Sequence, residues 1–210
     1  FFPVIGITFG IALAGSDRGL AAVLGPGARS VLVVLAGVLV TGGFSPRGIA
    51  DLAEAIWRGA RQAPTGIARI GPVGIAAALA WLAISAWLLS TIALPAARMS
   101  ALITAMLLSR WSMVPIGYGL KAGEHWGLGV PYEGGIKFRE FAVSSVVALG
   151  LAMGLYANVG IVAIVAAALA ILGLRLFASR RLRGASGYVL AGGCAIVEAV
   201  VFAVIALFTT

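Results

Sequence analysis

Residues 72–92 read PVGIAAALAWLAISAWLLSTI, a run of 21 residues without a charge. A bilayer core of ~30 Å needs about 20 apolar residues per helix, so this run predicts a membrane span. Further spans are predicted at roughly residues 1–15, 30–43, 99–118, 140–156, 159–177 and 187–208. The first two are short, and a tight turn at Asn158 separates the two before the last. We therefore expect an all-α polytopic transmembrane helix bundle of six or seven spans.

Composition points the same way, since 61% of the residues are hydrophobic and only 10% are charged, with a mean hydropathy of +1.09. A soluble domain carries about 25% charged residues, so residues 1–210 are expected to form a single integral membrane domain in a lipid bilayer.

The chain begins at Phe1 without Met, and we expect a native N-terminal stretch to be missing. The single Cys194 excludes an internal disulfide and a Cys-based zinc site. The net charge of +8 does not indicate nucleic-acid binding, because the Arg residues lie between apolar segments and not in a basic patch on a soluble scaffold.

The basic residues gather in three loops, at residues 44–71, at 119–139 and around 178–186, which hold 11 of the 15 Lys and Arg residues. Seven spans would put all three loops on one side of the membrane. Loops rich in Lys and Arg face the cytoplasm. We therefore expect a multi-pass protein of the cell (inner) membrane whose basic face is cytoplasmic and whose C-terminus lies on the other side.

Residues 45–62 predict a cytoplasmic amphipathic helix that starts at Ser45 and Pro46. Its polar stripe contains Arg47, Asp51, Glu54, Arg58 and Arg61, and its apolar face contains Ile49, Leu52, Ala53, Ile56 and Ala60. One interpretation is a helix that lies among the lipid headgroups. The other takes Asp51 and Glu54, one turn apart, as oxygen ligands of Mg²⁺. The two interpretations are compatible.

Three further charged residues are candidates for a site. Arg69 lies in a Gly-rich turn, where it would hold a phosphate oxygen or simply follow the positive-inside rule. Arg110 lies inside the fourth span, and its side chain either snorkels to the interface or meets an anion in the bundle interior. Glu198 is the only acid deep in a predicted span, and its expected partner is Arg110. The lone His125 is expected to be a loop residue.

Four ordered blocks of this sequence resemble the cobalamin synthase family, the adenosylcobinamide-GDP ribazoletransferases. Residues 42–55, GGFSPRGIADLAEA, resemble the family's G-G-x-H-x-D-G-L-A-D-x-x-D-G, and residues 67–74, IARIGPVG, resemble D-S-R-I-G-T-x-G. The pair Ser109-Arg110 and the later EHWGLG at 124–129 match the family's S-R and E-x-x-G-L-G. Residues 184–198, GASGYVLAGGCAIVE, resemble G-x-T-G-D-x-L-G-A-x-x-E-x-x-E. The resemblance covers essentially the whole chain.

This resemblance implies that α-ribazole, or its 5′-phosphate, attacks the phosphate that carries cobinamide and that GMP leaves, in cobalamin biosynthesis. Such phosphoryl transfer uses Mg²⁺ across the phosphates and cations for the spreading charge. The implied catalytic residues are Asp51, Glu54 and Glu198, of which Asp51 and Glu54 would hold Mg²⁺. The residues implied to bind the substrates or cofactor are Arg69, Arg110, Ser186 and Gly187. The sequence leaves open whether the protein forms a homo-oligomer.

The chain departs from the family pattern at several acidic positions. Ser45 stands for the family's His, and Asp is replaced by Arg47, Ile67 and Tyr188, while Ala195 stands for Glu. Arg47 lies four residues before Asp51, within ion-pair reach on one helix face, and it would repel Mg²⁺. The alternative function is therefore a catalytically degenerate family member that binds a corrinoid or nucleotide or scaffolds partner enzymes. A small transporter is a weaker alternative, because the broken-helix pattern with midplane charges is missing apart from Glu198.

Overall fold

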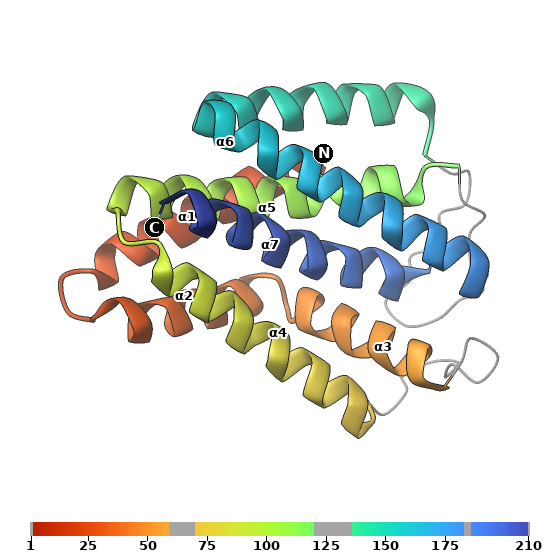
Figure 1. Ribbon diagram of the computed structural model, residues 1–210, viewed down its shortest axis with the longest axis horizontal. Helices are drawn as coiled ribbons and strands as arrows, with labels where there is room; N and C mark the ends of the chain where they lie inside the picture. Colours follow the sequence, from red (N-terminus) through yellow and green to blue (C-terminus); the bar gives the residue numbers. More distant parts are fainter. Residues whose placement is uncertain (1, 59–69, 120–135, 183–185, 210) are drawn as a thin grey trace.

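The computed structural model describes residues 2–58, 70–119, 136–182 and 186–209, and every regular element among them is a helix (Figure 1). The helices are α1 (Phe2–Leu20), α2 (Pro26–Val40), α3 (Phe44–Arg58), α4 (Pro72–Thr91), α5 (Pro95–Gly117), α6 (Phe138–Arg181) and α7 (Gly187–Thr209). Helix α6 folds back on itself into two arms, Phe138–Tyr156 and Asn158–Arg181, where the sequence predicts a tight turn. The all-α class is confirmed.

Five described helical segments are long and apolar enough to cross a membrane: α4, α5, the two arms of α6, and α7. The count is six if α2 and α3, which meet at an angle of 84°, are taken as one broken span. Pro26, Pro72 and Pro95 lie in the first turn of α2, α4 and α5, where a missing N–H costs nothing and the fixed φ suits the helix. The polytopic bundle is confirmed, although several helices are longer than the predicted spans.

The helix ends that flank the three basic loops lie at one end of the bundle. Figure 1 shows the end of α3, the end of α5, both ends of α6 and the start of α7 on its right-hand side. The α1–α2 link, the α4–α5 link and the turn within α6 lie on the left. We call the first side the basic end and the second the opposite end.

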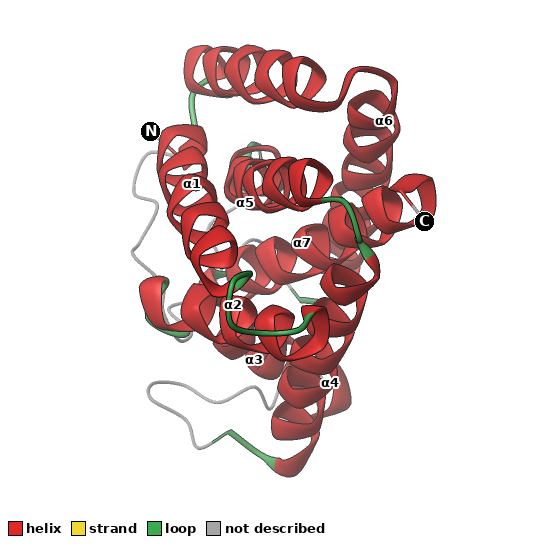
Figure 2. Ribbon diagram, turned by 90° about the vertical axis from the view of Figure 1, so that its left-hand side faces the viewer, coloured by secondary structure: helices red, strands yellow, loops and turns green. Residues whose placement is uncertain are grey.

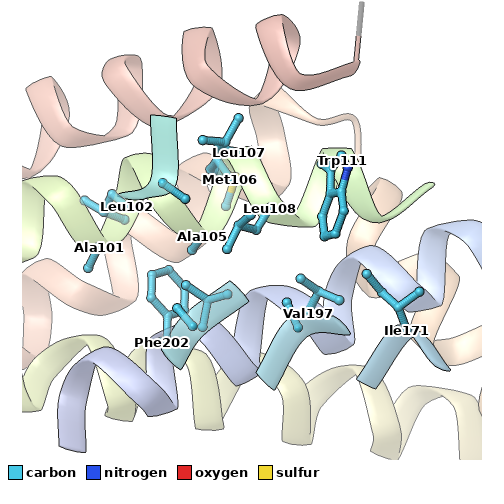
Figure 3. Packing of buried hydrophobic residues seen from close by; sticks show 14 of the residues in the cluster. Ala101, Leu102, Ala105, Met106, Leu107, Leu108, Trp111, Ile171, Val197 and Phe202 are labelled. Atoms are coloured by element: carbon cyan, nitrogen blue, oxygen red, sulfur yellow. The ribbon is translucent and has the colours of Figure 1, made fainter. Parts of the chain in front are cut away.

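Helix α5 is the centre of the bundle, enclosed by α1, α6 and α7 (Figure 2). Leu102, Leu107 and Leu108 of α5 are almost fully buried, and they belong to the same hydrophobic cluster as Val197 and Phe202 of α7 (Figure 3). Helix α1 approaches α5 through Gly6 and Gly10, where an added Cβ would lie 2.6 Å from the Met106 oxygen and from the Ile103 Cα. This spacing of small residues lets two helix backbones approach closely in lipid.

Helix α3 starts at Phe44, one residue before the predicted capping serine. The predicted division of α3 into a polar stripe and an apolar face is wrong in part. Ile56 and Trp57 are exposed by 54% and 74%, whereas Glu54 from the predicted polar stripe is only 5% exposed. The buried face contains Ser45, Gly48, Ala50, Leu52, Glu54 and Ala55. Helix α3 packs on α7 and α4, so the face turned to the protein combines Leu52 with small residues, whereas Ile56 and Trp57 face outward.

An ionic cluster without any counterpart among the sequence predictions is buried at the opposite end. Asp17 of α1 accepts hydrogen bonds from Arg98 of α5, at 3.1 Å from Nε and 2.6 Å from Nη2. Arg98 also donates to the Ser30 hydroxyl and to the Leu89 carbonyl oxygen, and Arg29 Nε lies 3.3 Å from Asp17 Oδ1. Arg98 is completely buried. The cluster joins α1, α2, α4 and α5 at this end.

Replacing Asp17 by Ala should destabilise the protein strongly, because the charge of Arg98 would be left buried without its counter-ion. Breaking a buried pair in this way costs about 3–5 kcal/mol. Exposed Arg18, one residue further along α1, provides the control, and Arg18→Gln should change stability by no more than about 0.5 kcal/mol. Unfolding in detergent micelles measures both variants, and equal stability of the two would contradict the assigned role of Asp17.

Candidate active site

The link between α2 and α3 is a sharp elbow made by two glycines. Gly42 and Gly43 have φ of 62° and 75°, in the left-handed region that side chains other than glycine rarely adopt. The elbow turns the chain by 84°, so α3 starts beside the bundle and runs to the basic end. Gly48 then brings α3 against the backbone of α7, where an added Cβ would collide with Ala191 and Gly192. Two of the family-like blocks, at 42–55 and 184–198, are in this way packed together.

Glu54 fixes the other side of α3 to the first turn of α4. Its Oε1 accepts the N–H of Gly74 at 2.9 Å, and its Oε2 accepts Nε of Arg58 at 2.8 Å. The N-cap residue of α4 is Gly71, which has no side chain to satisfy the free N–H groups of the first turn, so the carboxylate of Glu54 does so from another helix. The hydrogen bond from Gly74, followed by that from Arg58, lowers the pKa of Glu54.

Asp51 is paired with Arg47, as the spacing of four residues predicts. Arg47 Nε lies 3.4 Å from Asp51 Oδ2, and both side chains are partly exposed. Burial raises the pKa of Asp51 above its ordinary value, although the charge of Arg47 acts in the opposite direction. A raised pKa makes the Asp51 carboxylate a stronger base than that of an ordinary aspartate.

The predicted Mg²⁺ ligands Asp51 and Glu54 do not fit a resident metal ion as they stand. Both oxygens of Glu54 accept hydrogen bonds, and Asp51 faces the positive charge of Arg47. Within residues 2–58, 70–119, 136–182 and 186–209, no three His, Cys, Asp or Glu side chains come together as a metal site. Mg²⁺ demands near-octahedral oxygen ligands and gives up its water reluctantly, so one partly available carboxylate does not hold it.

Arg110 points into the protein, not to the interface. Its side chain is only 5% exposed, and its guanidinium lies over two aromatic rings, 5.9 Å from the centre of Phe9 and 5.2 Å from that of Phe44. Both Nε and Nη2 are buried without a hydrogen-bond partner. The predicted partner, Glu198, is also buried, but none of the ion pairs between described residues joins the two. The prediction that both face the interior agrees with the structure, whereas the expected pair is not formed.

The remaining predicted residues divide between the start of α7 and the part of the chain outside the described ranges. Gly187 is the first residue of α7 at the basic end, Ser186 directly precedes it, and the buried Ser186 hydroxyl has no hydrogen-bond partner. Arg69 and His125 lie outside the described residues. Asp51, Glu54, Ser186 and Gly187 therefore lie on the two packed helices α3 and α7, and Arg110 lies beside the elbow from which α3 starts.

The aromatic neighbours of Arg110 were missed by sequence reasoning. Phe9 is 101 positions away and Phe44 is 66 positions away, so no local spacing connects them to Arg110. The single signal was the position of Phe44 directly after the two glycines of the family-like block. An aromatic residue at an elbow indicates a contact with a neighbouring helix, but it does not say which helix.

A model of the cobalamin-5-phosphate synthase family matches residues 1–206 of this chain. The chain belongs to that family. The resemblance of the four sequence blocks to this family is thereby confirmed.

Two curated relatives carry the name adenosylcobinamide-GDP ribazoletransferase. The protein from Geotalea daltonii is 30% identical over 149 residues, which are 69% of this chain and 60% of the relative. The protein from Roseiflexus sp. strain RS-1 is 27% identical over 213 aligned residues, which cover 99% of this chain and 78% of the relative. The match with the Geotalea protein thus spans less than two thirds of that protein's length. No solved structure matches this synthase-family chain.

Replacing Glu54 by Gln should remove a pH-dependent part of the stability. The pKa of Glu54 in the folded protein is lowered from the ordinary 4.5, so the unfolded chain binds a proton at that site more readily. The stabilisation is complete above about pH 4.5 and is lost as the pH falls through the folded pKa. Thermal unfolding in detergent should show a steeper acid loss for the unaltered protein than for Glu54→Gln. The exposed Glu140→Gln is the control, and a Glu54→Gln curve parallel to that of the unaltered protein would refute the capping role.

Proposed function

We propose that this chain is a membrane-bound ribazoletransferase that joins α-ribazole, or its 5′-phosphate, to adenosylcobinamide-GDP and releases GMP. A hydroxyl oxygen of α-ribazole forms a bond to the phosphorus that carries cobinamide, and the bond from that phosphorus to the oxygen of GMP breaks. The hydroxyl proton passes to a base. The observation that carries the proposal is the family match over residues 1–206, together with the names of both relatives.

The basic end is the natural place for this reaction, because both substrates are anionic when α-ribazole carries its phosphate. Arg58, Arg175, Arg180 and Arg181 lie in the last turns of α3 and α6, which end there, and Arg47 lies in the first turn of α3. Clustered cations raise the local concentration of anionic ligands and stabilise the charge that spreads in phosphoryl transfer. Under the positive-inside rule this end faces the cytoplasm, where such water-soluble substrates occur.

Asp51 is the residue that we assign as the proton acceptor. It lies at the basic end on α3, is partly exposed, and has a pKa raised by burial. Ser186 and Gly187, at the start of the adjacent α7, offer a hydroxyl and a backbone N–H to a phosphate. Glu54 contributes by fixing α3 to α4, which holds Asp51 in place.

A second function is favoured by a specific observation, the pairing of Asp51 with Arg47. With Glu54 engaged by Gly74 and Arg58, no carboxylate of α3 is unpaired. A chain of this kind would bind the corrinoid or the nucleotide, or scaffold partner enzymes, without turning the substrates over.

Release of GMP distinguishes the two functions. Purified protein with Mg²⁺ and both substrates should release GMP slowly, and Asp51→Asn should abolish the release, because the base is removed while the shape of the side chain is kept. Glu140→Gln, which alters an exposed carboxylate at the same end, should leave the rate unchanged. Binding of substrate without GMP release in the unaltered protein would establish the non-catalytic alternative.

The cytoplasmic placement of the basic end can be tested by thiol labelling. Cys194→Ala removes the only thiol, which is buried. In this background, Val23→Cys at the opposite end, where Val23 is 82% exposed, should react with an impermeant reagent in intact cells. Ser179→Cys, exposed near the end of α6, should react only after the cells are permeabilised. The reverse pattern would show that the orientation is inverted.

A further inference from the structure

The strongest unexplained feature of the interior is the unsatisfied charge of Arg110. A buried guanidinium carries five N–H donors and no acceptor, and a charge without a counter-ion is among the most expensive groups to bury. Arg110 is about 95% buried, and two of its nitrogens have no hydrogen-bond partner. The rings of Phe9 and Phe44 offset part of this cost by cation–π contact, but they cannot accept in-plane hydrogen bonds.

The start of α3 meets Arg110 at this same place. Phe44, whose ring lies under the guanidinium, is the first residue of α3, a helix of 15 residues. The positive end of the helix dipole is therefore directed toward the surroundings of Arg110. An added Cβ at Gly42 or Gly43 would meet nothing within 4 Å, so the elbow borders open space. Interrupted helices in membrane proteins use such half-helix N-termini for anionic groups.

Arg110 is one of two described cations near this elbow. Arg47, in the first turn of α3, adds a second positive charge, and its Nε lies 3.4 Å from Asp51 Oδ2. The opposing groups are Asp51, which is paired with Arg47, and Glu198 of α7, which forms no ion pair with a described cation. Ser45, buried at the second position of α3, supplies a hydroxyl.

We propose that the elbow of α2 and α3 together with Arg110 is an oxyanion site that takes a diphosphate group without a metal ion held by the protein. The guanidinium donates two parallel hydrogen bonds to phosphate oxygens, the geometry for which arginine is suited. That the diphosphate belongs to a nucleotide conjugate rests on the proposed function. The anion site itself rests only on the burial and the missing partners of Arg110.

Pyrophosphate, with EDTA present, is the probe for this site. It should bind the detergent-solubilised protein and raise its melting temperature. Arg110→Met should weaken the binding by at least about tenfold, because a charge-assisted hydrogen bond contributes about 1.5–3 kcal/mol. Without pyrophosphate, Arg110→Met should melt no lower than the unaltered protein, because it removes an unpaired buried charge. Arg18→Gln, an exposed cation at the opposite end, is the control and should bind normally.

Each outcome separates this site from the proposed function. Pyrophosphate binding that depends on Arg110 in a protein that releases no GMP would support the anion site and count against the transferase. If Arg110→Met and the unaltered protein both release GMP with the same KM for adenosylcobinamide-GDP, the anion site is overturned and the proposed transferase activity stands. Equal pyrophosphate binding by Arg110→Met, or binding that EDTA abolishes, would likewise overturn the proposal.

Discussion

A charge that is removed from water inside a bilayer needs a partner, and this constraint organises the two ends of the bundle. At the opposite end, Asp17 satisfies the fully buried Arg98, which also reaches Ser30 and the Leu89 carbonyl oxygen. Four helices are joined there around the pair of Asp17 and Arg98. Because Arg98 is completely buried, the positions of α1, α2, α4 and α5 relative to one another depend on this pair.

At the basic end the same constraint is met by hydrogen bonds between helices. Glu54 serves the first turn of α4, and the Arg175 side chain donates to the carbonyl oxygens of Pro115 and Tyr118 near the end of α5. Both side chains satisfy backbone groups that a helix end leaves unpaired. The helix ends around the candidate active site are thus held by side chains from neighbouring helices.

The spans could be predicted because apolar length is a local property of the sequence. Residues 72–92 and the observed α4 agree to within one residue, and the turn within α6 lies near Asn158, as predicted. The faces of α3 could not be predicted from polarity alone, because Gly48 permits a close approach that outweighs the apolar area of Ile56. Asp17 and Arg98 are separated by 81 positions, so their pairing has no local signal at all.

In the candidate site, glycine residues determine where α3 lies, but the charged residues on α3 differ from those of the family pattern. Where that pattern has His and Asp, this chain has Ser45 and Arg47, yet the glycine elbow and the contact of Gly48 with α7 hold α3 beside Arg110. Substituting Arg for Asp changes the local charge by two units, and two unit charges 4 Å apart interact by about 4 kcal/mol at an intermediate dielectric. That is more than the ~1.4 kcal/mol of a tenfold change in affinity. The scaffold thus carries Arg47 where the family pattern has an acid, and this change of charge is the reason to propose a phosphate group, and not a metal ion, as its ligand.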